Sequence, residues 1–368
     1  MRLPNKLLSV PSSVPGIFRA RGARMLLRLL LVLLLFYALG VCQSGGPPPS
    51  GPQGASQYPP ASDAPNQPGD TVQVPSGSSK TTVRKDQDTF VIRTEVDEVL
   101  LHATVVDDRR HLVMDLNREN FEVFENNAPQ RITSFRHADI PVSIGIVIDN
   151  SGSMRDKRPA VNQACINLVR ASNPQDEVFI VNFNDEYYLD QDFTSDINKL
   201  KDGLEKIESR GGTALYDAAV ASAQHLKKNT RLEKRVLLIV TDGEDNASRF
   251  SLEQTLRRLQ EESGPTVYAI GILGEERQKR AKRALSAISE QTGGQAFFPK
   301  DLKEVDEISR EVAHDIRNQY IIGYKPSTPQ ASGGFRTVKV QAHAPHHGKL
   351  FVRTRSGYYA NEQQAALQ

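Results

Sequence analysis

The sequence predicts an α/β fold in which a doubly wound, mostly parallel sheet is flanked by a small β-sandwich-like unit. Two observations lead to this prediction. After residue 140, nearly unbroken apolar runs alternate with amphipathic stretches, as in a parallel sheet covered by helices on both faces. Before and after this block, short apolar runs are broken by charged or Pro- and Gly-bearing turns, which is typical of antiparallel strands.

The α/β block extends over residues 140–319, an ordinary size for one domain. Apolar runs predict its central strands at residues 142–148, 178–181, 236–240 and 267–272. Amphipathic segments predict its helices at residues 161–171, 196–207, 215–228, 252–262, 281–291 and 305–319.

Residues 87–139 predict a small β unit. The period-two alternation of residues 121–125 places Phe121 and Phe124 in a strand-like segment, and Asn126-Asn127 predicts the turn that follows it. Residues 320–360 contain further short apolar runs. We expect these C-terminal strands to pair with residues 87–139, so that the α/β domain is inserted into one β-sandwich-like domain. Residues 361–368 are expected to be a disordered tail.

Residues 1–42 predict a signal peptide or an N-terminal membrane anchor. Four arginines precede an apolar stretch at residues 29–41, whose length of about 13 residues is short of the roughly 20 that a spanning helix needs. Cleavage, lipidation at Cys42 and retention as an anchor remain open. Each of them predicts an extracytoplasmic location for the rest of the chain, which would be secreted, periplasmic or membrane-anchored. Residues 43–86, rich in Pro, Gly, Ser and Gln, predict a disordered tether.

The overall composition excludes some partners. The formal net charge is only +2, from 46 Lys and Arg against 44 Asp and Glu, which is unlike the strongly basic surface of a nucleic-acid-binding protein. Contact with a membrane is expected only through the N-terminal segment. The two cysteines, Cys42 and Cys165, lie in such different contexts that no disulfide between them is expected.

Three places in the α/β block bring small oxygen-bearing side chains to the expected carboxyl ends of strands, where such sheets bind ligands. They are Asp149-Asn150-Ser151-Gly152-Ser153, Gly211-Gly212-Thr213, and Thr241-Asp242-Gly243. Each place has an ordinary structural explanation, because serines and threonines often cap helices and Asp-Gly is a common turn. Glu244 and Asp245 are interpreted as a solvated entry to a helix. The conjunction of the three places favours a shared site.

Here the sequence resembles the von Willebrand factor type A domain, which has a Rossmann-like sheet and a metal-ion-dependent adhesion site. The family signature is Asp-x-Ser-x-Ser after the first strand, a threonine in a later loop and an aspartate after the fourth strand. The residues that match it are Asp149, Ser151, Ser153, Thr213 and Asp242. More loosely, the flanking β segments resemble those of exported proteins of this family from acidobacteria.

The resemblance implies a site for Mg²⁺, or for Mn²⁺ or Ca²⁺, formed by these five residues. The resemblance implies that Ser151, Ser153 and Thr213 coordinate the ion directly, whereas Asp149 and Asp242 act largely through water. Because hydroxyls are neutral, the ion then retains much of its positive charge, and it also keeps an exchangeable coordination position. A Glu or Asp carboxylate of a partner protein can fill that position. The resemblance therefore implies an adhesion or scaffold module without enzymatic activity.

Two other functions remain open. The metal site of a structural surface module could be vestigial. Alternatively, a strand-end aspartate with a later Asp-Gly is also found in Mg²⁺-dependent aspartyl phosphotransferases, although their pattern needs a second aspartate where this chain has Ser151. A serine hydrolase is less well supported, since the chain has no Gly-x-Ser-x-Gly elbow.

Overall fold

The computed structural model describes residues 81–86, 89–94, 98–205, 208–230, 232–273, 279–328 and 334–360. The expected signal peptide or anchor at residues 1–42 and the expected tail at residues 361–368 lie outside the described residues. Within the described part of the chain, no helix combines the length and the apolar character that crossing a bilayer requires.

The centre of the α/β domain is a sheet with the strand order β12-β11-β10-β7-β8-β9. Its strands are β7 (Val142–Asp149), β8 (Glu177–Phe183), β9 (Tyr187–Thr194), β10 (Lys234–Thr241), β11 (Thr266–Gly271) and β12 (Ala296–Phe297). Neighbouring strands run parallel, except that β9 is antiparallel to β8. The α/β fold class with a mostly parallel sheet, predicted from the sequence, is confirmed.

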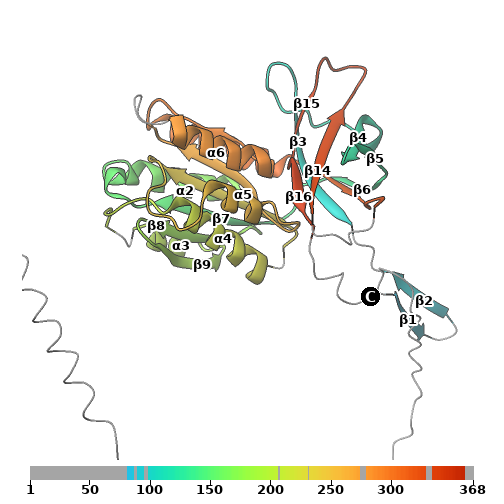
Figure 1. The fold of residues 1–368 in the computed structure, drawn as a ribbon, viewed down its shortest axis with the longest axis horizontal. Coiled ribbons are helices and arrows are strands. Elements are labelled where there is room, and N and C mark those ends of the chain that lie inside the picture. Colours follow the sequence, from blue (N-terminus) through green and yellow to red (C-terminus); the bar gives the residue numbers. More distant parts are fainter. Residues whose placement is uncertain are drawn as a thin grey trace, which may run out of the picture. The chain divides into compact units, whose positions relative to one another are not determined.

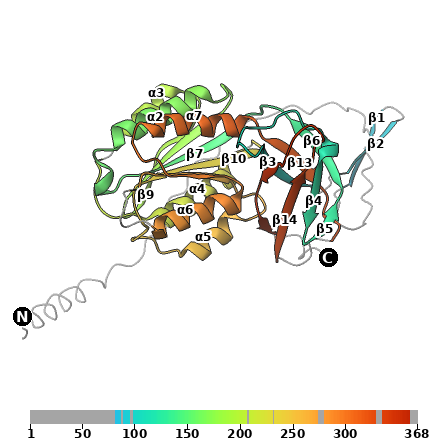
Figure 2. The ribbon, with the colours of Figure 1, turned by 90° about the horizontal axis from the view of Figure 1, so that it is seen from above.

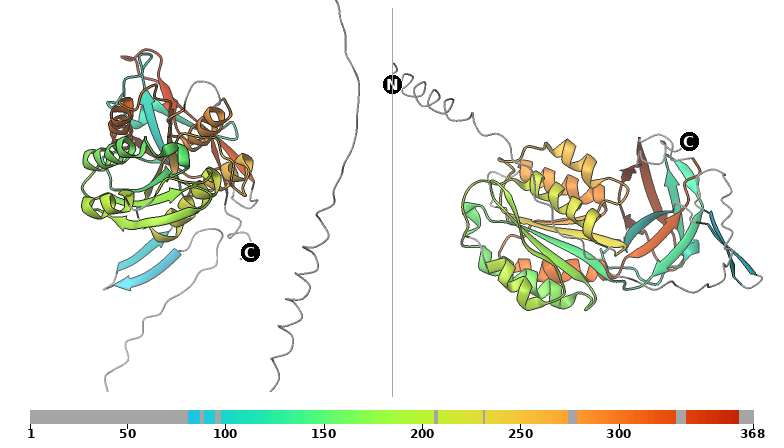
Figure 3. Two further views of the ribbon diagram at one scale, coloured as in Figure 1. Left: turned by 90° about the vertical axis from the view of Figure 1, so that its left-hand side faces the viewer. Right: turned by 90° about the horizontal axis from the view of Figure 1, so that it is seen from below.

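Helices cover both faces of this sheet (Figures 2 and 3). One face carries α2 (Arg158–Ala171), α3 (Ile197–Glu205) and α7 (Glu304–Arg317), and the other carries α4 (Leu215–Asn229), α5 (Leu252–Leu259) and α6 (Lys279–Thr292). Side chains of β7 alternate between two separate cores: Ile146 and Ile148 belong to the core under α2, α3 and α7, whereas Val147 belongs to the core under α4, α5 and α6. Burial on both faces explains why β7 is apolar almost throughout.

The strands around the α/β domain form two antiparallel sheets that share one core (Figure 1). The first sheet has the order β15-β3-β13-β6, formed by β15 (Phe351–Arg353), β3 (Val99–Val106), β13 (Tyr320–Tyr324) and β6 (Ile132–His137). The second has the order β16-β14-β4-β5, formed by β16 (Gly357–Tyr359), β14 (Phe335–Ala342), β4 (Phe121–Glu125) and β5 (Ala128–Gln130). Both sheets thus combine strands from before and after the α/β domain.

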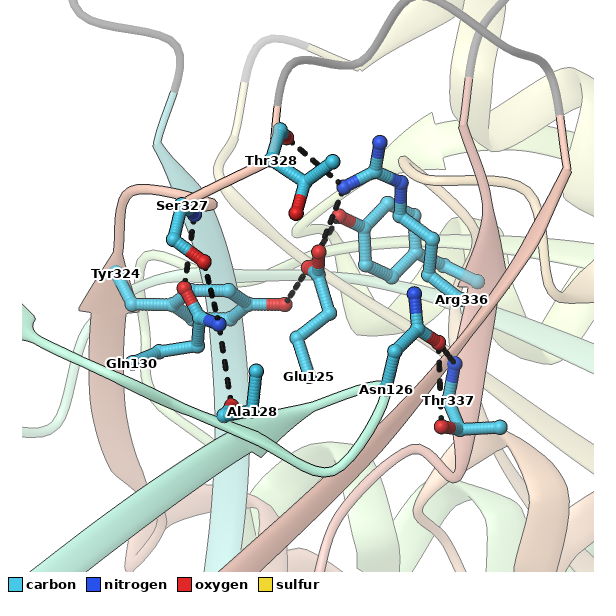
Figure 4. A network of polar contacts seen from close by, with 10 residues as sticks. Glu125, Asn126, Ala128, Gln130, Tyr324, Ser327, Thr328, Arg336 and Thr337 are labelled. Carbon is cyan, nitrogen blue, oxygen red and sulfur yellow. Dashed lines mark hydrogen bonds and ion pairs between the residues drawn. The ribbon is translucent and has the colours of Figure 1, made fainter.

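A buried ionic network lies inside this sandwich (Figure 4). The Glu125 carboxylate accepts hydrogen bonds from the hydroxyls of Tyr324 at 2.7 Å and Tyr358 at 2.9 Å. Its other oxygen contacts the Arg336 guanidinium at 2.6 Å. All four side chains are buried, so the ion pair and the two phenols satisfy one another where water has little access.

Some elements differ from the sequence prediction. Strand β1 (Thr81–Asp86) pairs with β2 (Thr89–Thr94). The prediction that the disordered tether extends to residue 86 is therefore wrong for residues 81–86. Residues 81–83 are Thr-Thr-Val, and β-branched residues of this kind favour a strand. Strands β9 and β12 were not expected. β9 is an edge strand in which the short apolar run Tyr187–Leu189 is exposed and is followed by polar residues, and β12 has only two residues. Two short 3₁₀ helices, η1 (Arg118–Asn120) and η2 (Gly152–Met154), complete the fold.

His102 in β3 gives the stability of the fold an expected pH dependence. Burial, together with the nearby positive charges of Lys234, Arg355 and Arg136, lowers the pKa of His102 from 6.5 to about 3. The unfolded chain therefore takes up a proton between these pH values while the folded chain does not.

We expect the free energy of unfolding to fall by up to ~1.4 kcal/mol per pH unit from this residue as the pH drops from 6.5 towards 3. His102→Gln should remove this contribution, which urea titrations of both proteins at several pH values would measure. His343→Gln, at an exposed position, is the control. Parallel pH profiles for the wild type and His102→Gln would contradict the expectation.

Candidate metal centre

The two predicted aspartates lie at the same edge of the central sheet. β7 and β10 are parallel neighbours, and their register places Ile148 beside Val240. Asp149 is the last residue of β7, and Asp242 directly follows β10. The loops after these two strands therefore start side by side at the carboxyl edge of the sheet, where open α/β sheets form their ligand-binding crevices.

Asp149 is completely buried, and both of its carboxylate oxygens accept hydrogen bonds. Oδ1 accepts from the backbone N–H of Ser151 at 2.8 Å, and Oδ2 accepts from the hydroxyl of Thr241 at 2.6 Å. Burial raises the pKa of Asp149, although these hydrogen bonds oppose the rise. Since Thr241 ends β10, the Asp149 side chain ties the first loop to the strand that leads to Asp242.

Hydroxyl groups continue this connection from Asp149 to Asp242. The Oγ atoms of Ser151 and Ser153 are 3.2 Å apart, and the Ser153 hydroxyl donates to Asp242 Oδ1 at 2.8 Å. The side chain of Asp242 has no exposed surface, and its Oδ2 contacts the ammonium group of Lys157. Four of the five predicted residues are thus joined by one continuous set of hydrogen bonds.

The loop that carries Thr213 lies against both of the others. The N–H of Gly152 donates to the carbonyl of Gly211 at 3.4 Å. A Cβ atom placed on Gly243 would lie 3.5 Å from Thr213 Oγ1, so this hydroxyl faces the Asp242 loop. Gly211 has a φ of +77°, and a Cβ there would come within 2.1 Å of Asp185 Oδ2, so this turn requires glycine. The structure therefore brings all five predicted residues to one place.

The hydroxyls of Ser151 and Thr213 do not serve as helix caps. Ser151 is the N-cap residue of η2, but its side chain makes no capping hydrogen bond. Thr213 lies one residue before the N-cap of α4, Ala214. Backbone N–H groups in the first turn of α4 donate instead to the side chains of Asp245 and Ser248. The alternative explanation of these two residues as caps therefore has no support from the hydrogen bonds.

Several supporting residues were missed by the sequence analysis. Asn150 accepts from the Ser209 hydroxyl at 2.9 Å and donates to the Glu208 carbonyl at 3.1 Å, which holds the segment before Thr213. Asn246 Oδ1 accepts from the N–H of Thr213 at 2.9 Å. Their partners are 33 to 59 residues away in the chain, and no local pattern predicts such pairs.

The interpretation of Glu244 and Asp245 as a solvated run is wrong for Asp245. This side chain is half-buried, and its Oδ1 accepts from the Ser248 hydroxyl at 2.5 Å and from a backbone N–H at the start of α4. Burial raises its pKa. Its negative charge lies at the positive end of the α4 dipole, which stabilises both the carboxylate and the helix. Glu244, in contrast, forms an ion pair with exposed Arg280 at 3.6 Å.

The chemistry of these donors fits a hard divalent cation. The five side chains offer only oxygen atoms, from two aspartates, two serines and one threonine, and such ligands suit Mg²⁺, Mn²⁺ and Ca²⁺. Both carboxylates are buried, and the single positive charge of Lys157, which contacts Asp242, does not balance two buried negative charges. No group of three or more His, Cys, Asp and Glu residues forms a metal site in the described residues, so the hydroxyls are needed to complete this donor set.

The α/β domain that contains this site matches a known protein family. The family model described as the von Willebrand factor type A domain matches residues 144–244. The chain contains a von Willebrand factor type A domain. The matched segment of this domain runs from β7 to the loop after β10 and includes all five candidate site residues. No curated protein matches the chain.

Solved structures with von Willebrand factor type A domains are among those similar to this chain. A von Willebrand factor type A protein from Catenulispora acidiphila is 15% identical, with 67% of this chain and 75% of that chain covered and a TM-score of 0.42. An aerotolerance-related membrane protein from Bacteroides fragilis is 17% identical, with 48% and 98% covered and a TM-score of 0.39.

Proximal thread matrix protein 1 from the mussel byssus, described with a zinc-occupied metal-ion-dependent adhesion site, is 18% identical. The similarity covers 53% of this chain and 50% of that chain, with a TM-score of 0.42.

Proposed function

We propose that the von Willebrand factor type A domain of this chain is an extracytoplasmic, metal-dependent protein-binding module and not an enzyme. A divalent cation, Mg²⁺ or alternatively Mn²⁺ or Ca²⁺, is bound by the site, and a Glu or Asp of a partner protein completes its coordination. The ligand residues are Asp149, Ser151, Ser153, Thr213 and Asp242. The observation that supports this proposal best is the hydrogen-bonded chain that joins the two buried carboxylates through the hydroxyls of Ser151 and Ser153. The Thr213 hydroxyl faces the Asp242 loop beside this chain.

The different charges of the hydroxyl and carboxylate groups in the site support binding of an acidic partner. Neutral hydroxyls do not offset the charge of a dication, and Asp149 already accepts two hydrogen bonds within the protein. A cation held in this way keeps much of its charge for an incoming carboxylate. Asp149 and Asp242 hold the loops in position and supply negative charge around the ion.

A location outside the cytoplasm is proposed from the arginine-rich and apolar pattern of residues 19–41. These residues lie outside the described part of the chain.

An Mg²⁺-dependent phosphotransferase is less well supported by the same geometry. Such an enzyme needs a carboxylate as general acid two residues after the nucleophilic aspartate. Ser151 stands at that position, and its hydroxyl is 3.2 Å from Ser153 Oγ. The residue therefore belongs to the hydroxyl cluster of the site.

Replacement of Thr213 tests the proposed function. We expect Thr213→Ala to weaken Mg²⁺ or Mn²⁺ binding by at least about 100-fold, because loss of even an outer-shell partner costs about 10- to 100-fold. The fold should be retained, since the backbone of Thr213 makes the hydrogen bonds to Asn246. Calorimetric titration of the wild type and the variant with each cation measures the effect.

Ser195→Ala, which removes a hydroxyl at an exposed position between β9 and α3, is the matched control and should bind as the wild type does. The same proteins test partner binding: proteins that the wild type retains in Mg²⁺ and releases in chelator should not be retained by Thr213→Ala. Metal affinity unchanged by the loss of Thr213 would count against the proposed site, and chelator-insensitive retention would favour a vestigial one.

A further inference from the structure

Lys157 places a positive charge inside the candidate metal centre. It lies eight positions after Asp149 in the sequence, at the N-cap of α2, and its ammonium group contacts Asp242 Oδ2. The other oxygen of Asp242 accepts the hydrogen bond from Ser153. Both oxygens of this predicted metal ligand therefore have partners from the protein, and one of these partners is a cation.

The setting of this ion pair makes Lys157 the more movable member. The side chain of Asp242 is fully buried, whereas 29% of the Lys157 side chain is exposed. The backbone of Lys157 is fixed by its N–H, which donates to the Met154 carbonyl at 2.9 Å. A lysine side chain has four methylene groups, so its ammonium can leave the carboxylate while the backbone stays in place. Asp242 has no comparable freedom.

We propose that Lys157 is a tethered cation that competes with the divalent ion for Asp242 and thereby sets the metal affinity of the site. This inference rests on the proposed function. An ammonium and a dication cannot share one carboxylate without strong mutual repulsion, so metal binding moves the ammonium away from Asp242. When the metal leaves, Lys157 returns and neutralises the buried carboxylate, which keeps the loops assembled.

Replacement of Lys157 by methionine separates these two roles. Methionine preserves the apolar stem but removes the charge, so Lys157→Met should bind Mg²⁺ or Mn²⁺ about tenfold more tightly or better. In chelator the same variant should unfold at a lower temperature than the wild type, because Asp242 then has no counter-charge. Lys157→Arg, which keeps the charge, should bind metal no more tightly than the wild type.

The experiment is a calorimetric titration of the full chain with MgCl₂ and MnCl₂, together with thermal unfolding in chelator. Lys199→Met, an exposed lysine in α3, is the control for loss of one positive charge. The inference is supported if Lys157→Met binds the cation more tightly than the wild type, Lys157→Arg and Lys199→Met do. This holds also if binding by the wild type is too weak to measure.

Equal or weaker binding by Lys157→Met, with normal binding by the wild type, would overturn the inference and leave the proposed function intact. In that case Lys157 would be a structural partner of Asp242 only. Absence of binding by every variant and by the wild type would overturn both.

Discussion

Asp315→Ala is expected to lower the free energy of unfolding by about 3–5 kcal/mol, because it removes a buried carboxylate from a network of several donors. Asp315 in α7 is almost fully buried. It accepts hydrogen bonds from the hydroxyls of Thr104 at 2.8 Å and Tyr268 at 2.7 Å, and it forms an ion pair with Arg353. The variant leaves all three groups without this acceptor.

The position of these partners explains why the effect should be large. Thr104 in β3 and Arg353 in β15 belong to the sandwich, whereas Tyr268 in β11 belongs to the central sheet. Asp315 therefore joins side chains from both domains in one buried network. Urea-induced unfolding measures the change. Glu307→Ala, at an exposed position of the same helix, should change the free energy of unfolding by less than about 0.5 kcal/mol. Similar small losses for both variants would contradict the expectation.

The sequence was most informative where periodicity and burial agree. β7 and β10 are apolar because helices cover both of their faces, and this pattern predicted their place in a parallel sheet. β9 could not be predicted in the same way. It is an edge strand with Tyr187, Tyr188 and Leu189 exposed, so few of its side chains are required to be apolar.

For the candidate site, the sequence predicted which residues come together but not how they are held. The order of Asp149, Thr213 and Asp242 along the chain, together with the parallel sheet, was sufficient to place their loops at one edge. The contacts of Lys157 with Asp242 and of Asn246 with Thr213 depend on side-chain directions across loops. A long lysine side chain reaches many positions, and its sequence neighbours do not indicate which one it takes.

The structure also changes what is expected of Asp149 variants. The sequence predicts a strand that ends at residue 148, which would place Asp149 in the following loop, where its removal would cost little stability. In the structure it is the last residue of β7 and has no exposed surface. Asp149→Ala would therefore leave the Ser151 N–H and the Thr241 hydroxyl without their acceptor. We expect this variant to lose metal binding and also about 1–3 kcal/mol of stability for such unsatisfied groups.

Asp149→Asn should separate the effect on stability from the effect on metal binding, because we expect it to raise the stability in chelator and to lower the metal affinity. Burial raises the pKa of Asp149, and the charge of Asp242 raises it further, which means that folding disfavours the ionised carboxylate at neutral pH. Asparagine has the same shape without the charge. Its carbonyl can accept from Ser151, and the Thr241 hydroxyl can rotate to accept from its amide. In chelator at pH 7, Asp149→Asn should therefore unfold at a higher temperature than the wild type.

Metal binding by Asp149→Asn should nevertheless fall by at least about 100-fold, because the site loses one of its two negative charges and an orienting carboxylate. Thermal unfolding in chelator and in excess Mg²⁺ measures both effects, since a cation that binds only the folded state raises the unfolding temperature. The wild type should gain stability on addition of Mg²⁺ and the variant should not. A variant that is less stable in chelator, yet still stabilised by the cation, would show that the Asp149 charge supports the fold and not the metal.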